Sequence, residues 1–159
     1  MLIIDTLSGA GKLSYKLSLL KNSLCLYHCL LDNDESGRKA YDDCSEDGLL
    51  SLKSTTFITC SGMTNSELED CINVDIYKDV VKEKYRVHLD IPLFKSSKKW
   101  SERIKEVFKA QGKIVNNKIE DELKTIVATS VAANPRSALN PHRRGAIDSL
   151  LESIEEMIP

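Results

Sequence analysis

The stretch that decides the fold runs from Leu24-Cys-Leu-Tyr-His-Cys-Leu-Leu31 into Asp32-Asn-Asp-Glu-Ser-Gly-Arg38. A short apolar run that stops at acidic residues and a glycine predicts a buried strand with carboxylates at the carboxyl edge of a parallel sheet. Asp32 and Asp34 can converge there, and close carboxylates suit a hard divalent cation such as Mg²⁺ or Mn²⁺. The same residues suit an ordinary turn with Asp34 or Ser36 as a helix N-cap, and spacing alone leaves both interpretations open.

Composition sets broad limits on the class of protein. A chain of 159 residues is most simply one domain with a real core, and its net charge of −2 gives no global attraction to nucleic acid. The five cysteines form no Cys-x-x-Cys pair, which favours reduced thiols in the cytoplasm over a disulfide framework. No apolar stretch approaches the roughly 20 residues that span a bilayer, and the start lacks the pattern of a signal peptide. We therefore expect a cytoplasmic protein without a membrane partner.

Strand-like and helix-like segments alternate along the first half of the chain. The run at 55–59 is β-branched and aromatic, which is typical of strands, whereas apolar residues recur at helical spacing in the second half. Alternation predicts βαβ units and a parallel sheet, so the expected fold class is α/β with a helical C-terminal part. We expect an α/β core over 1–95 and a helical extension over 96–159 that packs on it.

The expected elements follow from these patterns. Strands are expected at 2–4, 24–31 and 55–59, and helices at 12–20, 38–44, 101–111, 119–131 and 147–157, with Ser101 as an N-cap. A further helix is expected to begin at Ser66 and to continue through Ile72, or to start again near Asp75.

A second acidic cluster, Ser66-Glu-Leu-Glu-Asp70, follows the strand expected at 55–59. Loops after parallel strands emerge at one edge of the sheet, so this cluster can meet Asp32 and Asp34 in space. On a helix, Glu67 and Glu69 would lie roughly 200° apart, so only one of them would face a shared ion. Carboxylates gathered around one or two hard cations are what phosphodiester cleavage requires.

These pieces, in this order, resemble the TOPRIM (topoisomerase-primase) domain in the version found in the overcoming-lysogenisation-defect (OLD) family of ATP-dependent endonucleases. The likeness lies in the Gly9-Ala-Gly11 turn, in Leu30–Arg38, which is similar to that family's D-x-D-x-x-G-R, and in Ser66–Asp70, which is similar to its E-L-E-D signature. A weaker likeness is Lys124–Ala128, similar to a late helix that supplies a lysine.

The resemblance implies a Rossmann-type parallel sheet flanked by helices and a Mg²⁺- or Mn²⁺-dependent DNA endonuclease or nickase, with phage defence as a role. It implies that Asp32, Asp34 and Glu69, or else Glu67, are metal ligands. It also implies that Lys124 contacts the transition state or a phosphate.

The sequence departs from this family in one respect. TOPRIM domains begin with a strand that ends in Glu-Gly, but Met1–Ile4 looks like the second strand, and the family's ATPase domain has no counterpart here. We therefore expect an incomplete site that cleaves DNA weakly or not at all alone. The missing N-terminal part of a longer protein, self-association or an ATPase-bearing partner chain would complete it and cover the edge of the sheet.

Other classes of function remain open from the sequence. A catalytically silent TOPRIM-like module could bind DNA or a protein in a multi-subunit complex. A receiver domain or an aspartate-nucleophile phosphatase also places acidic residues at strand ends. Lys12, Arg38 and the Arg143-Arg144 pair could contact phosphate or be ordinary surface charges.

Overall fold

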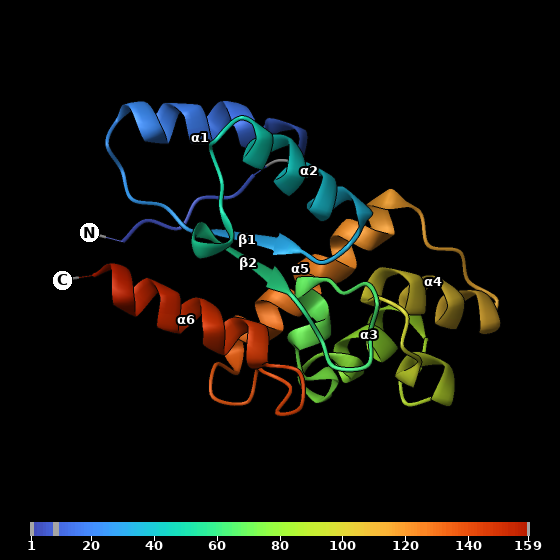
Figure 1. Ribbon diagram of the computed structural model, residues 1–159. Coiled ribbons are helices and arrows are strands. Elements are labelled where there is room, and N and C mark those ends of the chain that lie inside the picture. Colours follow the sequence, from blue (N-terminus) through green and yellow to red (C-terminus); the bar gives the residue numbers. More distant parts are fainter. Residues whose placement is uncertain (1, 8–9, 159) are drawn as a thin grey trace.

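The computed structural model describes residues 2–7 and 10–158 as a mixed α/β protein that is mostly helical (Figure 1). Its described part holds six α-helices and a parallel sheet of two strands. The strands are β1 (Cys29–Asp32) and β2 (Thr55–Ile58), and the helices are α1 (Leu13–Asn22), α2 (Glu35–Glu46), α3 (Lys78–Tyr85), α4 (Trp100–Ala110), α5 (Asn117–Ala133) and α6 (Gly145–Met157).

Helices cover both faces of the small sheet. In the register of the sheet Leu31 lies beside Phe57 and Asp32 beside Ile58. Leu31 and Phe57 belong to a core that includes residues of α1 and α2, whereas Leu30 and Ile58 pack with Ala146 of α6. Because successive side chains of a strand point to opposite faces, this gives the α/β/α layering visible in Figure 1.

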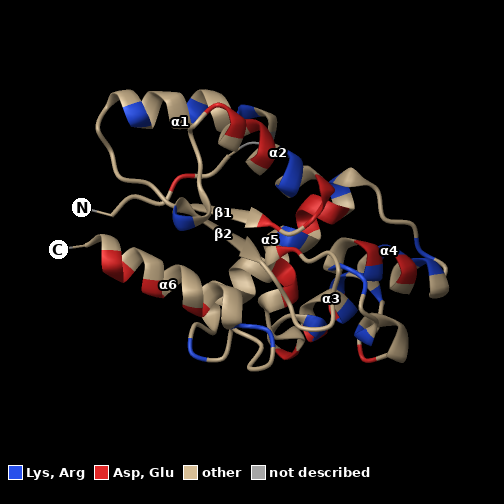
Figure 2. Ribbon diagram, in the orientation of Figure 1, with Lys and Arg blue, Asp and Glu red and all other residues tan. Residues whose placement is uncertain are grey.

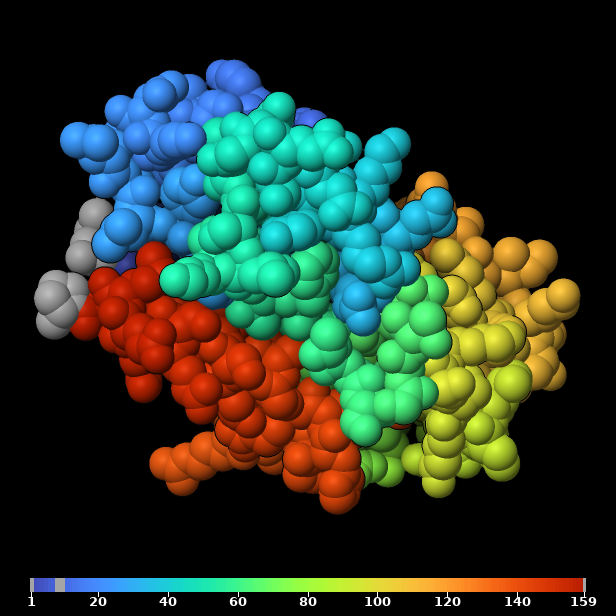
Figure 3. Space-filling view, viewed as in Figure 1, coloured from blue at the N-terminus to red at the C-terminus, as the bar shows by residue number. Residues whose placement is uncertain are grey.

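A larger core lies among the helices that follow the sheet. Its buried members come from α3 and its N-cap Tyr77, from α4 and α5, and from the segment between α3 and α4: Tyr77, Val81, Val87, Leu89, Phe94, Trp100, Ile104, Val107, Phe108, Leu123 and Val127. In the space-filling view α1 and α4 lie toward opposite ends of the molecule, and α2 lies between them (Figure 3). The expected division of the chain into an α/β core over 1–95 and a helical extension over 96–159 stays a prediction.

The strands differ from the expected ones at their beginnings. Residues 2–4 form no strand, and their side chains are exposed. The run at 24–31 becomes a strand only from Cys29, because α1 ends at Asn22 and Leu24 has a φ of 54°, a left-handed conformation that interrupts extended pairing. The strand at 55–59 is confirmed as β2, and Gly9 of the expected glycine turn lies outside the described residues.

The helices match the sequence better, with two corrections. The five helices expected at 12–20, 38–44, 101–111, 119–131 and 147–157 are confirmed as α1, α2, α4, α5 and α6. The helix expected from Ser66 is a short 3-10 helix, η3 (Leu68–Cys71), and Glu67 is its N-cap, whereas the alternative start near Asp75 leads into α3. Ser101 is not the N-cap of α4, because Lys99 holds that position. Within the described ranges, no helix combines the length and apolar character needed to cross a membrane.

Candidate functional site

The end of β1 and the start of α2 hold the first two acidic residues. Asp34 is the N-cap of α2, and its Oδ1 accepts a hydrogen bond from the Gly37 N–H at 2.9 Å. Oδ1 of Asp32 accepts a hydrogen bond from the Leu68 N–H at 3.0 Å, which ties β1 to the segment after β2. A bridge between Asn33 and Ser66 reinforces this link. The two loops expected to share one edge of the sheet therefore do meet.

Gly37 lets α2 begin directly against the end of β1. A Cβ atom added at this position would lie 2.0 Å from the carbonyl oxygen of Asp32, which is far inside contact distance. Only a residue without a side chain fits here. The glycine of the D-x-D-x-x-G segment thus fixes how closely the helix approaches both acidic residues.

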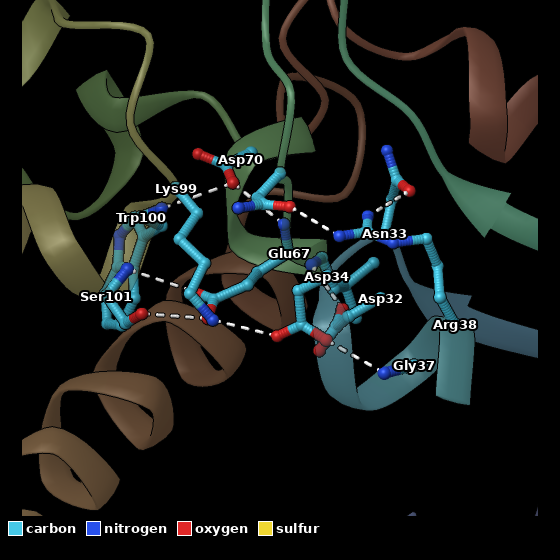
Figure 4. A network of polar contacts seen from close by, with 12 residues as sticks. Asp32, Asn33, Asp34, Gly37, Arg38, Glu67, Asp70, Lys99, Trp100 and Ser101 are labelled. Atoms are coloured by element: carbon cyan, nitrogen blue, oxygen red, sulfur yellow. Dashed lines mark hydrogen bonds and ion pairs between the residues drawn. The ribbon is translucent and has the colours of Figure 1, made fainter. Parts of the chain in front are cut away.

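Lys99 joins the two acidic loops. Its Nζ lies 2.8 Å from Oδ2 of Asp34 and 2.8 Å from Oε1 of Glu67, so the ammonium group bridges the two carboxylates (Figure 4). Glu67 is buried and also accepts hydrogen bonds from the backbone N–H and the hydroxyl of Ser101, at 2.9 and 2.8 Å. Every oxygen of Glu67 is therefore occupied by the start of α4.

Hydrogen bonds determine the protonation states of Asp34, Glu67 and Lys99. Burial disfavours the charged form of Asp34 and of Glu67, but the hydrogen bonds from Lys99 and from backbone N–H groups outweigh it and lower the pKa of both carboxyls. Burial also opposes the charge of Lys99, and its two carboxylate partners nevertheless raise the pKa of its ammonium group. The bridge is an ion pair at neutral pH.

Asp70 is a buried anchor of the second loop. Its Oδ2 accepts hydrogen bonds from the Glu67 N–H at 2.8 Å and the Trp100 N–H at 3.2 Å. Its Oδ1 pairs with the guanidinium group of Arg103, which is itself buried. These contacts fasten η3 to α4, so Asp70 positions the loop that carries its acidic neighbours.

Glu69 and Lys124 form a second pair beside Asp32. The Nζ of Lys124, on α5, lies 3.7 Å from Oε1 of Glu69. Burial raises the pKa of Glu69 and of Asp32, and the neighbouring Glu67 adds to both increases. The carboxylates of Glu69, Glu67 and Asp32 outweigh the burial of Lys124 and raise its pKa. The acidic residues therefore share one electrostatic environment, seen as red segments around the end of β1 (Figure 2).

The carboxylate oxygens of this region fit a hard cation only in part. Oδ2 of Asp32 accepts no hydrogen bond from the described residues, and burial among other carboxylates leaves Asp32 and Glu69 short of compensating positive charge. Asp34 and Glu67 already hold the ammonium group of Lys99. Across residues 2–7 and 10–158, no three His, Cys, Asp or Glu side chains are arranged to hold one ion. A cation that used Asp34 would have to displace Lys99.

The predicted site residues thus come together, with roles that differ in detail. Asp32, Asp34, Glu67, Glu69 and Lys124 lie in one region, although Glu67 and Glu69 flank the start of a 3-10 helix rather than opposite faces of an α-helix.

Sequence reasoning missed Lys99, Ser101 and Arg103 as partners of the acidic loops. The only signal for Lys99 was the cluster of lysines at 95, 98 and 99, which also suits a solvated surface.

The site is built from the ends of β1 and β2 and from α4 and α5, and its features are acidic side chains with two lysines. Comparison with protein-family models, with curated proteins and with solved structures finds no match to this chain.

Proposed function

We propose that this chain is a TOPRIM-type nuclease domain of the OLD kind, which cleaves or nicks DNA by hydrolysis or transesterification with Mg²⁺ or Mn²⁺. The observation that supports it is the meeting of two acidic loops at the end of β1. There, Asp32 accepts a hydrogen bond from the Leu68 N–H and lies in the same electrostatic environment as Glu69 and Lys124. The order Asp-x-Asp, Glu-x-Glu-Asp and a late lysine agrees with the motifs of that family.

Each residue has a role in this proposal. Asp32 and Glu69 would hold the metal ion, and Asp34 would join them once Lys99 withdraws; Glu67 is the alternative ligand on the second loop. The ion would activate water and neutralise charge on the phosphate. Lys124 has a long cationic side chain, so it can contact the DNA phosphate that would bind beside Asp32 and Glu69. A glutamate from another segment or chain, such as an ATPase-bearing partner, completes the ligand set.

Metal binding tests the proposal directly. Purified protein is titrated with Mn²⁺ and the free ion is measured by electron paramagnetic resonance. We expect binding that Asp32→Ala and Glu69→Gln weaken roughly tenfold or more, because each removes a charged ligand. The matched control is Asp42→Asn, which removes an exposed carboxylate on α2. Unchanged binding in both site variants would contradict the proposal.

A second candidate function is a catalytically silent TOPRIM-like module that binds DNA or a partner protein. The bridge from Lys99 to Asp34 and Glu67 favours it, because an internal ammonium group can compensate the carboxylates without a metal. In that case Mn²⁺ shows no site-dependent binding while the fold is intact. The same titration therefore separates the two functions.

A further inference from the structure

A cavity of about 310 Å³ lies beside Glu69 and Asp70, at the lower end of the roughly 300–1,000 Å³ typical of ligand sites. Its wall comes from η3 and the residues that follow it up to Tyr77, from the 3-10 helix η5 (Pro92–Lys95), from α4 and from the loop before α6. The basic side chains of this wall are Lys95, Arg103, His142 and Arg143. The cavity is therefore a place where positive charge converges next to the proposed nuclease site.

The acidic residues of this wall leave much of that charge free. Asp70 is already engaged by backbone N–H groups and by Arg103, and Glu69 pairs with Lys124. Arg143 reaches Asp70 only at 4.0 Å. Among the described residues no carboxylate lies within ion-pair distance of Lys95. The charged side chains left to a ligand are thus Lys95 and Arg143, in a wall that also holds the apolar or aromatic residues Ile72, Val74, Tyr77 and Phe94.

Arg103 supplies an unused donor in the same wall. It is 5% exposed, its guanidinium pairs with Asp70, and it donates a hydrogen bond to the Phe94 carbonyl oxygen at 2.7 Å. Its Nε–H has no acceptor among the described residues. A buried guanidinium donor without an acceptor is costly, and Arg103 places this positive charge directly behind the wall of the cavity.

We propose that this cavity binds a phosphate group. Arg and Lys side chains are the usual phosphate ligands in proteins, because a guanidinium donates paired hydrogen bonds and a lysine adds a mobile charge. Because Glu69 lines the cavity, the phosphate is one that neighbours the scissile phosphate on the same DNA strand; this part rests on the proposed function. The cavity would then hold the strand in register for cleavage.

The first experiment uses the three histidines of the chain as reporters. Inorganic phosphate is added to the full chain in EDTA, and the imidazole proton signals are followed by NMR. We expect saturable shifts of His142, with His28 and His88 unmoved because they lie outside the wall. Arg143→Gln and Lys95→Gln should each weaken binding roughly tenfold, the effect of one charge-assisted hydrogen bond. These variants avoid Arg103, whose loss would disturb the fold.

The controls are the neighbouring basic residues. Arg144→Gln removes a side chain that pairs with Asp148 on α6, and Lys98→Gln removes one that pairs with Glu106. Neither lines the cavity, so both should bind phosphate like the parent protein. Equal weakening by Arg144→Gln and Arg143→Gln, or shifts of all three histidines together, would overturn the site.

The second experiment distinguishes a DNA strand from free phosphate. A short single-stranded oligonucleotide and the same sequence with uncharged methylphosphonate linkages are titrated in EDTA. Tighter binding of the phosphodiester strand that Arg143→Gln abolishes supports the proposal, and equal binding of both strands overturns the assignment to DNA. Because no metal is present, this result is independent of the Mn²⁺ titration, so failure of one does not imply failure of the other.

Discussion

At the scale of single residues, the most consequential contact is the bridge from Lys99 to Asp34 and Glu67. Lys99→Met keeps the aliphatic stem but leaves a buried carboxylate without its counter-ion. We expect it to lower the free energy of unfolding by about 1–3 kcal/mol, less than for a fully buried pair because Lys99 is 21% exposed. A divalent cation binds the freed carboxylates in place of the ammonium group, so Mg²⁺ should restore part of the loss.

Chemical denaturation with and without Mg²⁺ measures both effects. Lys98→Met is the matched control, because its exposed pair with Glu106 contributes little stability. Two outcomes would contradict this role of Lys99. Either both methionine variants lose the same free energy of unfolding, or Mg²⁺ stabilises Lys99→Met no more than it stabilises the parent protein.

The residues of the site were predictable to different degrees. The convergence of Asp32 and Asp34 with the acidic residues at 67–70 could be predicted, because motifs at the ends of consecutive parallel strands meet at one edge. Lys99 could not, because it meets Asp34 across 65 residues and only the packing of α4 brings it there. The expectation that only one of Glu67 and Glu69 faces a shared ion assumed an α-helix. The segment forms the 3-10 helix η3, so the angle of an α-helix does not apply to it.

At the scale of elements, Gly37 controls how α2 meets β1. Alanine normally favours a helix over glycine by about 1 kcal/mol. Here its Cβ would lie 2.0 Å from the Asp32 carbonyl oxygen, and backbone cannot move as a side chain can. We expect Gly37→Ala to reduce the free energy of unfolding by about 3 kcal/mol, through overpacking. Thermal denaturation measures it, with Ser36→Ala, one residue earlier and exposed, as the control. A Gly37→Ala protein as stable as the parent would mean that α2 does not approach β1 this closely.

The elements themselves show which sequence signals are dependable. Helices such as α4 and α5 repeat apolar residues over several turns, so their existence follows from local pattern. Strand character at residues 2–4 did not produce a strand, because β-structure needs a partner and these side chains are exposed. Leu24 and Leu26 are exposed for the same reason, so the apolar run is longer than β1.

At the scale of the whole molecule, the sheet has an unpaired edge and apolar residues gather near it. Among the described strands β2 is the only partner of β1, so the other edge of β1 carries free backbone groups. Residues 2–7, the segment 24–28 and the end of α6 lie at the same end of the molecule (Figure 1). There Ile4 is 90% and Leu26 79% exposed. An open edge with exposed apolar side chains favours pairing with a second chain.

We therefore expect the purified protein to self-associate through this end, with a sedimentation coefficient that rises with protein concentration. Ile4→Lys and Leu26→Lys place charges on the surface and should shift the equilibrium toward the monomer, since charged edges resist pairing. Ile114→Lys is the control, because Ile114 is 85% exposed in the connection between α4 and α5, away from the sheet. A single monomeric species over a wide range of concentration would show that the open edge of β1 does not pair with a second copy of this chain. An ATPase-bearing chain would then be the partner to test on the same surface.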